Sequence, residues 1–331
     1  MRVLVTGAAG FLGGYMVQEL VLRGHDVTGM VRPSNSSHPD WDGRVPTRVA
    51  DLTDAESLIR ATEGMEAVIH LAAYYTFHGK KELYDKVTVG GTRSLLQACV
   101  RNGVKTFIYC SSTEAIGPVE SPPADEDTPL RPFYEYGRSK VAAEEEVRES
   151  GASGIKWTII RPSGFYGPGN VDDVSYWFIT SFARNSLVTR FIVGSGMNLV
   201  QFVHARDVVS AFVLALENPE VAKGQTYVIS DDHAWSYRDL YYMMAELCGR
   251  RPPSRHLPKA LAKAMMAPVG AFNRLTGRES FMWHMSTVDS VTSDRSFSSA
   301  KAARELGYRP STGLRDGLRE TIAWYKANGY L

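Results

Sequence analysis

A tyrosine and a lysine four residues apart are the first pair in this sequence that could move a proton. In YEYGRSK, residues 134–140, Tyr136 and Lys140 stand at positions i and i+4, which share one face of a helix. A free phenol, with a pKa of about 10, is a poor acid–base group at neutral pH. A nearby ammonium stabilises the phenolate and lowers that pKa. The pair therefore predicts proton exchange with a substrate oxygen, although Y-x-x-x-K also occurs by chance on ordinary helices.

A hydroxyl that could assist this pair lies upstream, in SSTEAIG, residues 111–117. Ser112 follows the apolar run 105–110, so we expect its hydroxyl at the carboxyl end of a strand. From there it can hydrogen-bond the same substrate oxygen and stabilise developing negative charge. The three side chains predict hydride-transfer chemistry, in which a nicotinamide exchanges the hydride and Tyr136 the proton.

Three glycines follow the first apolar run with a spacing that suits a dinucleotide. They stand in GAAGFLG, residues 7–13, between an expected strand at 2–6 and an expected helix at 11–23. The first glycine permits a tight turn, the second lets the backbone approach a pyrophosphate, and the third allows close helix–strand packing. The start of the helix then directs free N–H groups at the phosphates. We expect the cofactor to contact five residues here: Gly7, Gly10, Phe11, Leu12 and Gly13.

The end of the second expected strand bears on the choice of cofactor. An acidic residue there would bind the ribose of NAD, but this sequence has Arg32. A guanidinium can pair with a 2′-phosphate through two charge-assisted bonds, so NADP(H) is favoured over NAD(H). A solvated surface arginine is the alternative. Asp51 and Leu52, after the third strand, are expected to border the adenine, although this stretch also resembles a helix start, for which Thr53 or Asp54 is the better cap.

Short apolar runs alternate with helical patterns through the first half of the chain. Expected strands are 2–6, 26–31, 67–71, 105–110 and 156–161, and expected helices are 11–23, 54–63, 82–102 and 134–149. This alternation predicts an α/β fold with a Rossmann-like, doubly wound parallel sheet. Ligands should then bind at the carboxyl ends of the strands.

After residue 161 the pattern changes to loops, later strands at 199–203 and 226–230, and a largely helical end. We expect a dinucleotide-binding domain over 1–165, to which 198–233 returns. A smaller, mostly helical substrate-binding part should comprise 166–197 and 234–331. Within it, 257–275 is expected to form a flap interrupted by Pro268, or alternatively to lie on a membrane surface.

Composition excludes several classes of function. The 331 residues carry a formal net charge of +1 and no long basic run, so we expect a small-molecule substrate and no nucleic-acid partner. The three cysteines form no CxxC pair, which argues against a metal site or disulfides and favours the cytoplasm. No apolar stretch is long enough to span a bilayer.

The stretches TGAAGFLG, DLTD, HLAA, SSTEAIG, YGRSK, RPSGFYGPG and FVHARDV occur in the order and spacing of one family. The chain resembles the extended short-chain dehydrogenases/reductases, within the NAD-dependent epimerase/dehydratase superfamily, over nearly its whole length. The resemblance implies that Tyr136 is the acid–base residue, Lys140 its partner and a ribose ligand, and Ser112 the third member. Alignment on Gly117 selects Ser112 rather than its neighbours. Four further cofactor contacts are implied: Ala72, Ala73, Pro162 and Ser163.

The resemblance also implies a homodimer formed through helices 82–102 and 134–149. One position departs from the family pattern, because Thr88 replaces the Asn of an N-V-x-G-T stretch. Any support that this Asn gives to the lysine is therefore in doubt here.

Two positions bear on the branch of the family. Sugar-nucleotide epimerases and dehydratases usually have an Arg-Asp pair where this chain has Val200 and Gln201, and a later Arg-Pro-Gly-Asp stretch is replaced within 289–301. Losing the arginine removes charge-assisted bonds to a diphosphate. The stretch NLVQFVHARDV and the helical segment 257–285 resemble instead the branch of 3β-hydroxysteroid dehydrogenases and dihydroflavonol reductases.

The resemblance to this branch implies an NAD(P)-dependent oxidoreductase that interconverts a secondary alcohol and a ketone. Its substrate should be lipophilic, of a steroid-, terpenoid- or polyketide-like class, and four residues are candidates to contact it: Tyr74, Thr113, Phe165 and Tyr166. An NDP-sugar 4-epimerase or dehydratase is the alternative enzyme. A non-catalytic dinucleotide-sensing regulator is the alternative of another class.

Overall fold

A computed structural model describes the chain except for residues 35–42, 44, 77–78, 172–173 and 277–284. Its central feature is a seven-stranded sheet in the order β11-β6-β5-β4-β1-β2-β3, with every neighbouring pair parallel. The strands are β1 (Arg2–Thr6), β2 (Asp26–Val31), β3 (Thr47–Val49), β4 (Ala67–His70), β5 (Thr106–Cys110), β6 (Lys156–Pro162) and β11 (Gln225–Ile229). The predicted Rossmann-like α/β fold is confirmed.

Helices cover both faces of the sheet, which is why its central strands β4 and β5 are buried along their whole length. One face packs α1 (Phe11–Leu22), α7 (Ala205–Glu217), α8 (Pro219–Ala222) and α12 (Ala300–Leu306). The other packs α2 (Ala55–Thr62), α4 (Gly91–Arg101) and α5 (Glu135–Glu149). Side chains along β1 alternate accordingly: Val3 and Val5 join the first core and Leu4 the second.

The helix expected over 82–102 is not a single regular helix. It begins as α3 (Lys81–Leu83), continues as a π-helix over Tyr84–Gly90, and becomes α4. Gly91 packs so closely that a Cβ there would lie 2.7 Å from the Leu52 Cβ. Within the π-helix, Thr88 Oγ1 accepts a hydrogen bond from the Tyr74 N–H at 3.1 Å. The residue that departs from the family pattern thus anchors the loop after β4.

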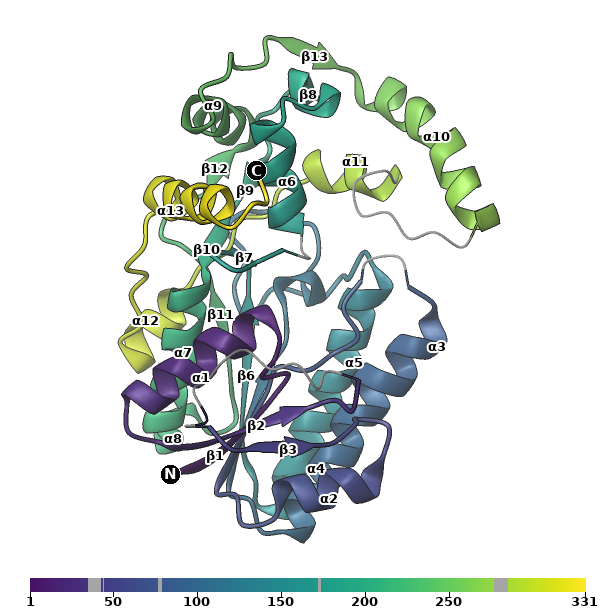
Figure 1. The fold of residues 1–331 in the computed structure, drawn as a ribbon. Helices are drawn as coiled ribbons and strands as arrows, with labels where there is room; N and C mark the ends of the chain where they lie inside the picture. Colours follow the sequence, from purple (N-terminus) through teal and green to yellow (C-terminus); the bar gives the residue numbers. More distant parts are fainter. Residues whose placement is uncertain (35–42, 44, 77–78, 172–173, 277–284) are drawn as a thin grey trace.

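A second layer of small elements covers the carboxyl end of the sheet (Figure 1). Three two-stranded sheets form it: β7 (Gly164–Tyr166) with β10 (Phe202–His204), β9 (Leu199–Val200) with β12 (Trp235–Ser236), and β8 (Phe191–Val193) with β13 (Arg255–Leu257). Its helices are α6 (Val174–Ala183), α9 (Tyr237–Leu247), α10 (Lys259–Thr276), α11 (Met285–Val291) and α13 (Leu314–Ala327). The short helical turn Leu187–Arg190 also belongs to it, whereas the turns Thr113–Ala115 and Ser150–Ser153 pack against α5 and β6 in the sheet layer. We call the second layer the lid.

Two features of the lid region differ from expectation. Helix α12 lies beside α7 against the sheet (Figure 1), and Ala302 and Leu306 belong to the first core. Helix α10 continues through Pro268 instead of being interrupted there. It is tied to α11 by Lys259 and Lys263, whose ammonium groups lie 2.9 and 2.7 Å from the Asp289 carboxylate.

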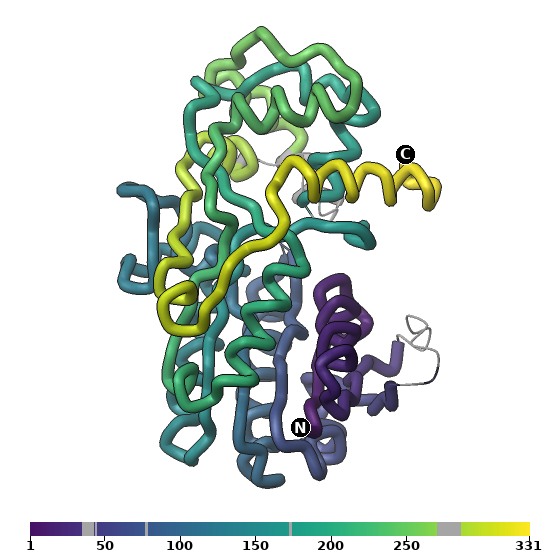
Figure 2. The backbone as a smooth tube through the Cα atoms, turned by 90° about the vertical axis from the view of Figure 1, so that its left-hand side faces the viewer, coloured from purple at the N-terminus to yellow at the C-terminus, as the bar shows by residue number. Residues whose placement is uncertain are grey.

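Figure 2 shows the C-terminal helix α13 crossing the lid, while the N-terminal strand and α1 belong to the sheet layer. None of the helices in the described residues has the length and apolar character needed to cross a membrane.

Candidate active site

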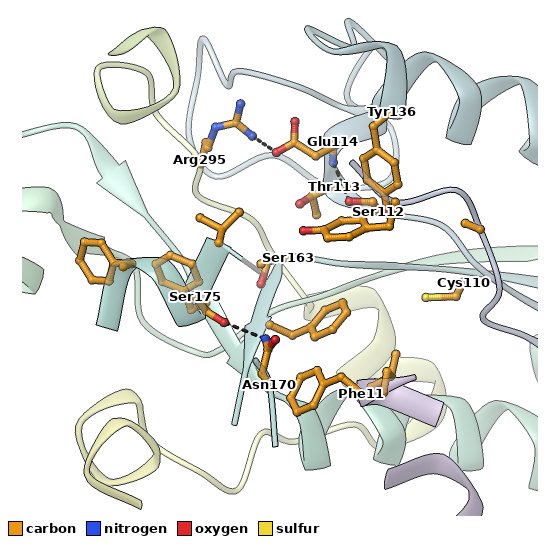
Figure 3. Close-up of a pocket in the computed structure, with 18 of the residues that line it drawn as sticks. Phe11, Cys110, Ser112, Thr113, Glu114, Tyr136, Ser163, Asn170, Ser175 and Arg295 are labelled. Carbon is orange, nitrogen blue, oxygen red and sulfur yellow. Dashed lines mark hydrogen bonds and ion pairs between the residues drawn. The ribbon is translucent and has the colours of Figure 1, made fainter. Parts of the chain in front are cut away.

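A cavity of about 570 Å³ lies between the carboxyl ends of β1, β5 and β6 and the lid. The sheet side contributes the glycine loop, the SST turn and the start of α5, whereas the lid contributes apolar side chains such as Val174, Phe178 and Leu240. Figure 3 shows residues from both sides converging on it. Its size lies within the usual range of small-molecule sites, roughly 300–1,000 Å³.

The glycine loop has the form of an anion cradle. Gly7 has a φ of +69°, in the left-handed region that favours glycine. A Cβ on Gly13 would overlap the carbonyl oxygen of Gly7, so the close approach of α1 to this turn requires glycine. Gly10 is the N-cap of α1 and gives no side-chain cap, which leaves the first N–H groups of the helix for a ligand. Gly7, Gly10, Phe11, Leu12 and Gly13 all line the cavity.

The proton-transfer candidates meet at the opposite wall. Tyr136 is 8% exposed and Lys140 is 2% exposed, both from the first turns of α5. The Lys140 Nζ lies 5.6 Å from the centre of the Tyr136 ring and donates a hydrogen bond to the Cys110 carbonyl at 2.7 Å. Burial lowers the pKa of the Lys140 ammonium, against the opposing influence of Cys110 and Glu144. The i, i+4 spacing therefore brings the ammonium beneath the phenol.

The structure distinguishes Ser112 from its neighbour. Ser112 Oγ accepts a hydrogen bond from the Glu114 N–H at 3.1 Å, which leaves its own proton available for a substrate oxygen. Ser111 instead donates to the buried Glu144 carboxylate at 2.5 Å. Figure 3 shows Ser112 and Tyr136 among the side chains that line the cavity. The two serines thus face different partners.

Of the four cofactor contacts that the family resemblance implied, two line the cavity and two do not. Ala73 and Ser163 line it, whereas Ala72 packs against Gly7 and Pro162 ends β6. Ser163 Oγ is buried and lacks a hydrogen-bond partner within the described part of the chain. An orphaned hydroxyl in the same cavity as an uncapped glycine loop fits a dinucleotide whose nicotinamide end supplies the missing partner.

The adenine-end candidates lie outside the cavity lining. Arg32 is exposed just after β2, and its charge helps to lower the pKa of Asp51. The larger cause is Thr53, whose hydroxyl and N–H donate to Asp51 Oδ1 at 2.7 and 2.8 Å. Asp54, not Asp51, caps α2. Leu52 is buried against Gly91.

The four substrate candidates separate into two groups. Thr113 and Phe165 line the cavity, and the Phe165 ring stacks on Phe11 with centroids 6.0 Å apart. Tyr74 and Tyr166 do not appear in that lining. Tyr166 packs in the lid core, where its hydroxyl lies 3.4 Å from the Leu314 carbonyl. Tyr74 and Tyr166 are close in sequence to residues that line the cavity, but packing in the lid directs the Tyr166 side chain away from the cavity.

Two charged residues in the cavity wall were not expected from the sequence. Glu114, two residues after Ser112, forms an ion pair with Arg295, which is 7% exposed and enters from the segment after α11. Burial opposes the charge of Arg295, but Glu114 keeps its pKa above the ordinary value. The Nε and Nη2 atoms of Arg295 have no hydrogen-bond partner among the described residues. No local pattern could have revealed a pair separated by 181 positions.

The positions of the missing Arg-Asp pair are also in the cavity wall. Val200 is buried there, and the Gln201 amide is engaged inside the protein. Gln201 Nε2 donates to Ser230 and to the Asp231 carbonyl, while Oε1 accepts from the Phe297 N–H at 2.8 Å. These contacts connect the lid to the end of β11. Because Val200 and Gln201 are both uncharged, neither offers a diphosphate the charge of the missing arginine. The described residues hold no cluster of three or more metal-ligating side chains.

A family model described as the NAD dependent epimerase/dehydratase family matches residues 3–230. The chain is 30% identical to the 3 beta-hydroxysteroid dehydrogenase/Delta 5→4-isomerase of Mycobacterium tuberculosis, over 98% of this chain and 90% of that protein. It is also 30% identical to sterol demethylase protein B of Methylococcus capsulatus, over 100% of both. A double mutant of the dTDP-glucose 4,6-dehydratase of Streptomyces venezuelae, solved with NAD, has 26% identity and a TM-score of 0.79, covering 100% of this chain and 98% of that one.

Proposed function

The chain belongs to the NAD dependent epimerase/dehydratase family, and we propose that it interconverts a secondary alcohol and a ketone on a lipophilic substrate. It is an NAD(P)-dependent enzyme of the extended short-chain dehydrogenase/reductase type, with a pattern like that of the 3β-hydroxysteroid dehydrogenases. The sequence-based expectation of an enzyme is confirmed. Its substrate and the roles of its residues are the content of the proposal.

One observation carries the proposal. The buried Tyr136–Lys140 pair and the Ser112 hydroxyl face a cavity whose remaining wall is largely apolar, next to a glycine loop that fits a dinucleotide. A ketone oxygen placed between the serine and tyrosine hydroxyls would have its developing charge stabilised by both. The apolar wall would exclude water from the reacting carbon.

The dinucleotide, when bound, supplies or accepts the hydride. In alcohol oxidation Tyr136, as phenolate, takes the hydroxyl proton, and in ketone reduction it returns that proton to the oxygen. Lys140 favours the phenolate electrostatically, because its ammonium is buried close to the ring. Ser112 orients the substrate oxygen by donating the proton that its contact with the Glu114 N–H leaves available.

The charges in the cavity favour a lipophilic substrate over a sugar nucleotide. Among its described lining residues, the cations are Lys140 and Arg295. Arg295 is neutralised by Glu114, and Lys140 is bound to a backbone carbonyl. The described cavity lining therefore offers a diphosphate no arginine that is not already paired with a carboxylate. A steroid-like substrate, in contrast, would bury its rings against the apolar side chains. The relatives named as steroid and sterol enzymes support this choice.

The cofactor is of the nicotinamide dinucleotide type, and we propose a preference for NADP(H). Arg32 supports it, because this exposed guanidinium follows β2 where a 2′-phosphate would lie. We also propose a homodimer through α4 and α5, and a cytoplasmic location remains a prediction. Light scattering of the purified protein tests the dimer: a monomeric mass at micromolar concentration would exclude it.

A substrate panel tests the main proposal. We expect the purified protein to reduce NADP⁺ or NAD⁺ with 3β-hydroxysteroids, or to oxidise NADPH or NADH with cyclic and β-keto compounds. UDP- and dTDP-sugars should give neither epimer nor dehydrated product. Tyr136→Phe is the control, since it preserves the ring and removes the proton-transferring hydroxyl. Turnover of a nucleotide sugar without turnover of any lipophilic alcohol or ketone would refute the proposal.

A further inference from the structure

A buried carboxylate lies one helical turn beyond Lys140 and makes four bonds. Glu144 is fully buried and accepts from the Ser111 hydroxyl at 2.5 Å. Arg161 donates to it through Nε at 2.8 Å and Nη2 at 2.6 Å, in the side-on, two-bond arrangement that fixes both groups. Arg148 Nη2 adds a fourth bond at 2.7 Å. Few geometries satisfy all these bonds at once.

Each of these partners belongs to an element that carries part of the candidate site. Ser111 follows the last residue of β5 and immediately precedes Ser112. Glu144 shares α5 with Tyr136 and Lys140, at successive steps of four residues. Arg161 lies in β6, immediately before the Pro162–Ser163 turn. The Glu144 carboxylate is therefore the point at which three separate active-site segments are joined.

We propose that Glu144 is a positioning residue, which sets the geometry of the Ser112–Tyr136–Lys140 group by binding Ser111 and Arg161. It touches neither substrate nor cofactor and acts through the residues that do. This inference rests on the proposed alcohol–ketone chemistry, because that chemistry assigns the proton transfer to Tyr136.

Burying a charged pair is an expensive way to hold two elements together. A buried ion pair often stabilises a fold no better than apolar residues of similar volume, but its geometry is much more restrictive. Burial by itself would raise the pKa of Glu144, yet its bonds to Arg161 and Ser111 lower it, so the carboxylate is ionised. An ionised, fully bonded group suits a joint that must not shift during catalysis.

The same negative charge acts on Lys140. Burial lowers the pKa of the Lys140 ammonium, whereas Cys110 and Glu144 raise it. The titratable groups that face Lys140 are His70 from β4, Tyr109 and Cys110 from β5, and Tyr136 and Glu144 from α5. Among them Glu144 has its charge fixed by the cations Arg161 and Arg148. Glu144 thus has two separable effects: it orients Ser111 and it supports the charge of Lys140.

Three variants separate these effects. Glu144→Gln removes the charge and weakens the joint, whereas Ser111→Ala removes only the contact to the SST turn. Glu146→Gln is the matched control, because it removes one charge from the same helix at a residue that pairs with Arg93 on α4 instead. We would measure kcat and KM for an active alcohol, the Kd of the cofactor, and the melting temperature. Tyr136 is titrated by its phenolate absorbance, as the difference from the same variant carrying Tyr136→Phe.

Glu144→Gln should lower kcat about 10- to 100-fold, with a cofactor Kd within about threefold of the original. Its Tyr136 titration should be displaced by about one unit, because both the Glu144 charge and the Lys140 charge that it supports act on the phenol. Ser111→Ala should lower kcat about three- to tenfold and leave that titration in place. Glu146→Gln should resemble the parent protein in every measurement.

The titration needs no substrate, so it separates this inference from the proposed function. If no alcohol or ketone is turned over, the proposed function fails, while a displaced Tyr136 titration in Glu144→Gln still supports the role of Glu144. If Glu144→Gln does not fold, Ser111→Ala decides. A folded Ser111→Ala protein with unchanged kcat, or a Glu144→Gln protein with unchanged titration and kcat, would overturn the inference.

Discussion

Replacing Lys140 by Met should displace the pH dependence of alcohol oxidation by about two units. Lys140 is 2% exposed, and its ammonium lies 5.6 Å from the centre of the Tyr136 ring. At this separation, and with an effective dielectric constant of about 20, a unit charge stabilises a phenolate by about 3 kcal/mol. At 1.36 kcal/mol per pKa unit, this corresponds to a shift of roughly two units.

The direction follows from the proton balance. Removing the cation raises the pKa of Tyr136, so less phenolate is present at a given pH, and oxidation requires phenolate. We expect the rising limb of kcat/KM to move to higher pH and the value at pH 7 to fall about 100-fold. Ketone reduction requires the protonated phenol and should fall less at the same pH. Met fills a similar volume and carries no charge, so the variant avoids the cost of burying the Lys140 ammonium.

The assay is the initial rate of NAD(P)H formation across a pH series at saturating cofactor, with the melting temperature as a check on folding. Saturation matters because Lys140 is also implied to bind the cofactor ribose. A limb displaced by less than half a unit in a folded variant would refute the electrostatic role of the lysine. An equal loss in both reaction directions would point instead to misplacement of the substrate.

Three further predictions concern the fold and the cofactor. Gly13→Ala should destabilise the protein by about 1–3 kcal/mol and weaken dinucleotide binding more than tenfold, because the new Cβ would overlap the Gly7 carbonyl. Gly14→Ala is the control in thermal melts and binding titrations, since nothing lies within 4 Å of a Cβ at that position. Equal behaviour of the two variants would contradict the packing argument. His70 is buried, and burial lowers its pKa to about 3. Below pH 6.5 the unfolded state therefore binds a proton at this histidine, whereas the folded state does not. The free energy of unfolding should consequently fall by roughly 3 kcal/mol between pH 6.5 and 4. His70→Gln should flatten that loss in urea unfolding, and an unchanged acid slope would be inconsistent with it. Arg32→Asp should reverse the preference for NADP⁺ by about 10- to 100-fold in the ratio of KM values, and an unaltered ratio would show that Arg32 does not meet the 2′-phosphate.

Much of the fold could be predicted because its signals are local. A buried parallel strand needs an uninterrupted apolar run, and a glycine loop between strand and helix needs its three glycines within seven residues. The boundaries of β1, β2 and α5 accordingly lie within one residue of those expected. The π-helix around Thr88 was not foreseen, because the residues at 82–102 carry only an ordinary helical pattern.

The candidate site divides along the same line. The spacing of Tyr136 and Lys140 on one helix is sufficient to place both side chains on one face, and the position of Ser112 after β5 brings it to the same edge of the sheet. Ionic partners depend on contacts between distant segments. The Glu114–Arg295 pair and the bonds of Glu144 to Ser111 and Arg161 therefore required the packed structure.

Reaction chemistry and substrate selection thus have different origins in this protein. The acid–base helix, the serine turn and the phosphate loop are short segments whose conformation follows from periodicity and glycine placement, so the residues alone predict a hydride-transfer enzyme. The cavity exists only because the lid folds over the sheet, with Arg295 neutralised by Glu114 and Gln201 bound to the protein interior. Those arrangements depend on long-range packing and on the cost of burying unpaired charge, neither of which a local pattern expresses.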